Sequence, residues 1–248
     1  MTASVLGSRP LREVIDRMDA GSGARPDNFY PDLVSGLPEP ARRWLQYSIR
    51  PGTPLADSAQ LSMHGTIRLG SWRPFTARQV ILADAGFIWA ARSRLFRLPL
   101  AGFDRYLDGF GEMRWRLAGL IPVMSAHGPD VTLSAAGRLA GELVLVPTRL
   151  VGASWTPAGA DSAEFCVQIG PRLHRVRITV AADGRLRGVS LQRWGNPDGA
   201  GFRDHLFAVA MDGEIAAAGI RIPRELRASW SLEAGDFFHA YLDAVSFE

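Results

Sequence analysis

From Leu61 onward, apolar and polar residues alternate along the chain with a period of two. This pattern indicates β-strands that bury one face, and it is clearest over residues 61–69 and 75–82. Asp and Gly residues, such as Asp183–Gly184, separate successive runs and favour tight hairpin turns. Consecutive strands joined by short turns form antiparallel meanders. We therefore predict a mainly β fold: a single large curved antiparallel sheet of roughly ten strands, forming a half-barrel or open barrel.

Three segments have helical spacing instead. The first is Leu11–Met18, the second follows Pro38, and the third spans about Ser134–Val144. We expect these few short helices to cover the concave face of the sheet. We divide the chain into an N-terminal helix and loop, residues 1–36, and one β-rich half-barrel domain, residues 37–248.

Composition excludes several classes of function. All 28 basic residues are arginines, so a Schiff-base lysine or a P-loop lysine is impossible. The net charge of +3 is too small to predict a nucleic-acid partner. Cys166 is the single cysteine, which fits a reducing compartment. Because no secretory signal or long apolar run is seen, we expect a cytoplasmic protein without stable membrane insertion.

Several short stretches resemble a bacterial family of uncharacterised proteins, of the DUF6544/DUF6920 type. They lie between Pro74 and Ala91, between Asp104 and Pro129, and between Gly137 and Trp155, with further matches from Arg193 to Phe238. The resemblance covers most of the chain after about residue 37. It departs at Leu145–Val146, where the family usually has Trp-Phe before the central proline.

This family has no agreed activity to carry over. Its pattern is similar to the half-barrel of bacterial lipoprotein carriers, in which helices close the concave side of a curved sheet. The resemblance therefore implies a concave apolar cavity, although a fold alone does not define a function.

Metal and cofactor sites are not indicated by the sequence. The five histidines include no pair at helical ligand spacing, and no HExxH motif or cysteine pair is present. Gly109-x-Gly111 lies between strands, where a hairpin turn is expected rather than a nucleotide site. We expect no cofactor and no metal, while a site assembled across the fold from His127, Asp130 and Glu142 stays open.

Glu142 is the main candidate for acid/base chemistry, assisted by His127 or Tyr106. It lies among apolar neighbours in the central helix, and desolvation would raise its pKa as a catalytic acid or base requires. The structural alternative is a buried glutamate paired with an arginine, such as Arg105 or Arg149.

The tryptophans on the predicted inner face either fill a core or line a pocket. Our leading hypothesis is that the protein binds an apolar small molecule between the concave sheet face and the covering helices. The alternatives are a cofactor-independent isomerase, cyclase or hydrolase of a hydrophobic metabolite in the same cavity, and a protein without a ligand. The predicted ligand contacts are Gln79, Trp89, Met113, Trp115 and Tyr241, whereas strand arginines such as Arg78, Arg92, Arg114 and Arg177 should lie on the solvated convex face.

Overall fold

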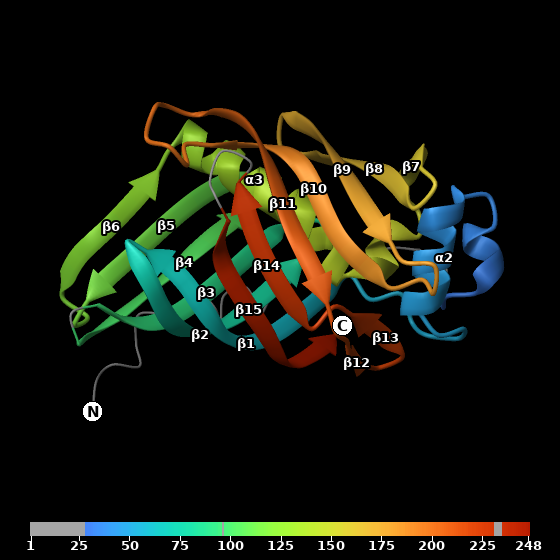
Figure 1. Cartoon of the computed structure of the whole chain (residues 1–248), viewed down its shortest axis with the longest axis horizontal. Helices are drawn as coiled ribbons and strands as arrows, with labels where there is room; N and C mark the ends of the chain where they lie inside the picture. Colours follow the sequence, from blue (N-terminus) through green and yellow to red (C-terminus); the bar gives the residue numbers. More distant parts are fainter. Residues whose placement is uncertain (1–27, 96, 231–234) are drawn as a thin grey trace.

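The computed structural model describes residues 28–95, 97–230 and 235–248. In this part of the chain, thirteen antiparallel strands form one sheet that does not close into a barrel (Figure 1). The strands that precede the central helix are β1 Ser58–Leu69, β2 Ser71–Leu82, β3 Gly86–Leu95, β4 Leu98–Leu107, β5 Phe110–Leu117 and β6 Ile121–His127. Those that follow it are β7 Ser154–Gly159, β8 Ser162–Ile169, β9 Arg172–Val180, β10 Leu186–Gly195, β11 Arg203–Asp212, β14 Glu225–Trp230 and β15 Asp236–Phe247.

The remaining elements are short. A separate two-stranded sheet consists of β12 Ile215–Ala217 and β13 Ile220–Ile222. The helical segments are η1 Pro31–Val34, α2 Glu39–Ser48, α3 Pro129–Glu142, η2 Leu143–Leu145 and η3 Pro147–Leu150. No helix in the described ranges is long and apolar enough to cross a membrane.

Two runs of hairpins make up the large sheet. The order is β6-β5-β4-β3-β2-β1-β15-β14-β11-β10-β9-β8-β7, so the first and last strands of the sheet in sequence, β1 and β15, pair at its centre. The edges of the sheet are β6 and β7, and α3 follows β6 in the chain. This helix contacts β3, β4 and β5 from one run and β8, β9 and β10 from the other, so it lies inside the curve of the sheet (Figure 1). The predicted mainly β, curved antiparallel sheet is therefore confirmed.

Three details differ from the prediction. The central helix begins at Pro129, not near Ser134: proline suits a first helical position, and Gly128 before it has a positive φ of 110°. Strands β4 and β6 were not predicted. The buried residues of β4 do not alternate along the strand, and β6 is a largely exposed edge strand. The segment Leu11–Met18 lies outside the described residues.

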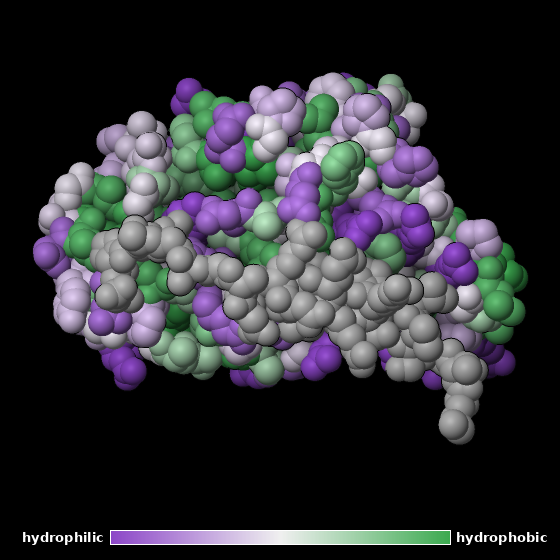
Figure 2. Space-filling model, turned by 180° about the vertical axis from the view of Figure 1, so that it is seen from behind, coloured by the Kyte–Doolittle hydropathy of each residue, from purple (hydrophilic) through white to green (hydrophobic). Residues whose placement is uncertain are grey.

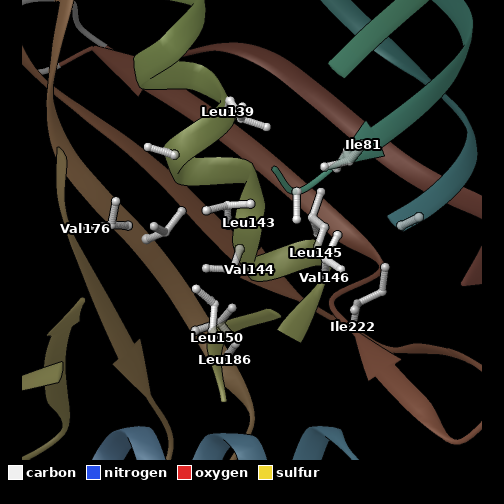
Figure 3. Packing of buried hydrophobic residues seen from close by; sticks show 14 of the residues in the cluster. Ile81, Leu139, Leu143, Val144, Leu145, Val146, Leu150, Val176, Leu186 and Ile222 are labelled. Carbon is white, nitrogen blue, oxygen red and sulfur yellow. The ribbon is translucent and has the colours of Figure 1, made fainter. Parts of the chain in front are cut away.

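The core follows the alternation read from the sequence. Phe75, Ala77, Gln79 and Ile81 on β2 are all buried on the concave face, and the strand arginines named above are exposed. Leucines and valines of α3, η2 and η3 fill the space between the two runs of strands (Figure 3). On the face shown in Figure 2, hydrophobic and hydrophilic side chains are interspersed rather than gathered in one continuous hydrophobic surface.

Candidate functional site

Four of the five predicted ligand contacts come together on the concave face. Gln79 pairs with Trp89, Trp89 with Asp104, and Asp104 with Met113, so these residues form one row across β2, β3, β4 and β5. Trp115 lies two residues beyond Met113 on β5, and its ring centroid is 5.8 Å from that of Trp89.

Tyr241 is placed elsewhere. It pairs with His64 on the outer face, and its ring packs against the guanidinium of Arg224, 4.6 Å from the ring centroid. A bulge shifts the register of β15: Leu242 pairs with Met63, whereas Ala244 pairs with the preceding residue of β1. The sequence pattern, read as a strict period of two along β15, missed this bulge.

Side chains of α3 cover the row and form a polar network with it. Both carboxylate oxygens of Glu142 are occupied, because Gln79 Nε2 donates to one at 2.6 Å and Arg138 Nε to the other at 2.7 Å. Arg138 Nη1 also donates to Asp104 at 3.2 Å, and Trp115 Nε1 donates to the second oxygen of Asp104 at 3.0 Å. Burial raises the pKa of Asp104, although Arg138 and the indole N–H of Trp115 oppose this.

The network shows what occupies the predicted site. The guanidinium of Arg138 lies 4.6 Å from the ring centroid of Phe87 and 5.3 Å from that of Trp89. Gln79 and Trp89 are 3% and 2% exposed, so the protein's own side chains fill this part of the concave face. Glu142 does pair with an arginine, as the structural alternative expected, but the partner is Arg138. The two arginines named as examples pair elsewhere, Arg105 with Glu112 and Arg149 with Asp84. The i, i+4 spacing of Arg138 and Glu142 on one helix was the signal that could have identified the pair.

The other candidates for catalysis do not join Glu142. His127 is exposed on the edge strand β6 and pairs with Glu112, and Asp130 accepts a hydrogen bond from Trp194 Nε1 at 2.9 Å. Within the parts of the chain that the structure describes, no three His, Cys, Asp or Glu side chains gather closely enough to hold a metal ion. Tyr106 is 4% exposed on β4, and its hydroxyl has no hydrogen-bond partner among the described residues.

Tyr106 borders a cleft of about 650 Å³, which we call the side cleft. Its walls come from the turns after β2 and β4 on one side, and from the start of β7 and the end of β8 on the other. Leu139, Leu143 and Leu150 of the helical segments also line it. The buried lining residues are apolar, whereas Asp84, Arg149 and Gln168 add polar groups. The side cleft contains none of the five predicted ligand contacts; its other lining residues are Ala83, Ala85, Asp108, Gly109, Gly152, Ala153, Ser154, Cys166, Val167, Ile169 and Gly170.

These features define an open antiparallel half-barrel with a helix inside its curve and a cleft beside that helix. The chain belongs to the family of unknown function DUF6544, whose model matches residues 27–244. Among curated proteins, none matches the chain significantly.

Two crystal structures are similar to this one. The first is a LolA superfamily protein from Nitrosomonas europaea, with 10% identity, a TM-score of 0.45, and coverage of 84% of this chain and 92% of that chain. The second is a domain described as an outer membrane lipoprotein-sorting protein from Vibrio parahaemolyticus. Its identity is 8% and its TM-score 0.41, with coverage of 88% of this chain and 92% of that chain.

Proposed function

We propose that this protein binds an apolar small molecule in the side cleft, between the sheet and the helical segments. The observation that carries the proposal is the cleft itself, whose volume of about 650 Å³ lies in the range typical of small-molecule sites. Leu139 and Leu143 contribute apolar groups to its walls, whereas Asp84, Arg149 and Gln168 contribute polar ones. A ligand with an apolar body and a polar group would therefore be partly removed from water there. The site is thus displaced from the predicted row at Trp89, which the protein fills with Arg138 and Glu142.

Tyr106 gives the side cleft a polar anchor. Burial raises the pKa of its phenol, so the hydroxyl stays neutral and can donate a hydrogen bond at any physiological pH. Apolar pockets with a few placed polar groups orient their ligands in this way. A ligand with one hydroxyl or carbonyl group on an apolar body would suit the cleft best.

The proposal predicts that filling the side cleft removes binding. Ala153→Trp adds an indole to a half-buried position on the cleft wall, so it should weaken binding of the uncharged probe N-phenyl-1-naphthylamine about 10-fold or more. Fluorescence titration of the full-length protein measures this. Ala210→Trp on β11 is the matched control, because Ala210 is exposed and lies outside the cleft.

Equal affinities in both variants and the wild type would place the probe elsewhere, and the proposal would then be wrong.

The enzymatic alternative has no specific observation in its favour. An isomerase, cyclase or hydrolase acting through Glu142 would need that carboxylate to be accessible, and both of its oxygens already accept hydrogen bonds.

A further inference from the structure

Arg193 on β10 is a half-buried cation that forms no salt bridge with a described residue, although the charges of Glu142 and Asp104 act on it from a greater distance. Its Nε donates to the Ser134 carbonyl of α3 at 3.1 Å, and its guanidinium carbon lies 4.7 Å from the ring centroid of Phe207 and 5.1 Å from that of Trp230. Neither Nη atom donates to a described residue, whereas Arg138 pairs with two carboxylates. Burial, and then the charge of Arg138, lower the pKa of Arg193 to about 9, so it remains charged at neutral pH.

Two buried histidines flank Arg193 on the same face of the sheet. His205 on β11 is its cross-strand partner, and His174 on β9 continues the row, because Val176 pairs with Leu191 two residues along each strand. His205 is 5% exposed and His174 is 3% exposed. His205 Nε2 and both ring nitrogens of His174 have no hydrogen-bond partner among the described residues. We call His174, Arg193 and His205 the nitrogen row.

Helix α3 lies directly above this row at Gly137. A Cβ atom added there would be 3.0 Å from Arg193 Cγ and 3.7 Å from His174 Cε1, so both side chains lie under the same point of the helix. Buried polar atoms in proteins are nearly always hydrogen-bonded, so unpartnered nitrogens beside a cation without a salt bridge point to a ligand that accepts hydrogen bonds.

The chemistry of the row selects an oxyanion. A guanidinium offers two parallel N–H donors whose geometry matches a carboxylate, and a neutral imidazole adds one N–H donor. The adjoining surface is aromatic: Trp230 and Phe237 are both half-buried, with nearly parallel rings whose centroids are 6.5 Å apart. A ligand that uses both features has an anionic group joined to an apolar body.

We propose that the nitrogen row binds the carboxylate of an amphipathic ligand, whose apolar part lies on the rings of Trp230 and Phe237. Arg193 would donate to the carboxylate oxygens, and the histidines would complete their hydrogen bonding. This site goes beyond the proposed function, because no member of the row lines the side cleft. A phosphate on the same kind of apolar body offers similar oxygens, and the experiment below distinguishes a phosphate from a carboxylate.

The test compares decanoate, 1-decanol and decyl phosphate, with binding to the full-length protein followed by tryptophan fluorescence. Wild-type protein should bind decanoate more tightly than decanol. Arg193→Gln should weaken decanoate binding about 10-fold or more and leave decanol unchanged, since only the acid loses a charge-assisted hydrogen bond. Arg193→Lys keeps the charge but not the planar pair of N–H donors, so its affinity for decanoate should lie between those of the wild type and Arg193→Gln. Arg177→Gln is the control, because Arg177 is exposed on the neighbouring strand.

Several results would overturn the inference. Equal wild-type affinities for decanoate and decanol, or equal losses of both in Arg193→Gln, would leave Arg193 a purely structural residue. Tighter binding of decyl phosphate that is also lost in Arg193→Gln would replace the carboxylate with a phosphate. If Ala153→Trp weakened decanoate binding and Arg193→Gln did not, the acid would lie in the side cleft; the proposed function would stand and this inference would fail.

Discussion

His174 shows how much a single buried side chain can make stability depend on pH. Burial, and then the charge of Arg172, lower its pKa to about 4 from its usual value of 6.5, while Asp204 acts in the opposite direction. The unfolded chain therefore binds a proton at a higher pH than the folded protein does. The stabilisation is complete above about pH 6.5 and is lost as the pH falls from there toward 4.

We predict that the free energy of unfolding falls by about 1–2 kcal/mol between pH 7 and pH 5 because of His174. Urea unfolding at the two pH values measures this difference. His174→Leu should show a clearly smaller loss over the same interval. The same pH dependence in His174→Leu and the wild type would assign the effect to other groups.

At the scale of an element, α3 presents a different surface to each of its neighbours. Arg138 and Glu142 face the row on β2–β5, Leu139 lines the side cleft together with Leu143 of η2, and two glycines lie against β9 and β10. Residues three or four apart on a helix share a face, so a 14-residue helix can serve all three neighbours. The glycines let the helix approach the sheet closely.

The two glycines should respond differently to alanine. At Gly141 an added Cβ would be 3.4 Å from Leu191 Cδ2, an ordinary contact, so Gly141→Ala should stabilise the protein by about 0.5–1 kcal/mol through helix propensity. At Gly137 the Cβ would be 3.0 Å from Arg193 Cγ, so displacement of that side chain should offset the gain. Urea unfolding of both variants checks this. A loss above about 1 kcal/mol in Gly141→Ala would contradict it.

At the scale of the whole molecule, the sequence predicts what depends on neighbours along the chain. The burial of Phe75, Ala77 and Ile81 follows from a period of two within one strand, and the prediction was correct. The contacts of Gln79 with Glu142 and of Asp104 with Arg138 join residues that meet only after folding, so local patterns did not give them. The bulge in β15 likewise depends on its pairing with β1. The side cleft is formed by segments from Ala83 to Gly170. Of the predicted catalytic and ligand-binding residues, Tyr106 alone lines it, although it had been predicted to assist Glu142.

The pairing of β1 with β15 joins the two runs of hairpins into one sheet, and Gly65 lies opposite Ala240 in this pairing. A Cβ atom on Gly65 would be 2.0 Å from the His239 carbonyl oxygen and 2.9 Å from Ala240 Cα, both backbone atoms that cannot rotate away. Gly65→Ala must therefore push the central strands apart. We expect a loss of at least about 2 kcal/mol in the free energy of unfolding.

Gly36→Ala is the control for this experiment, because nothing lies within 4 Å of the added Cβ and the position has no left-handed φ. It should change the free energy of unfolding by no more than about 0.5 kcal/mol, and thermal unfolding followed by circular dichroism compares the two variants. Helix α3 contacts strands on both sides of the β1–β15 pair. Gly65→Ala should therefore also lower the affinity of the side cleft for N-phenyl-1-naphthylamine. Unfolding midpoints that are equal for Gly65→Ala and the wild type would show that the two runs do not depend on close contact at their central strands.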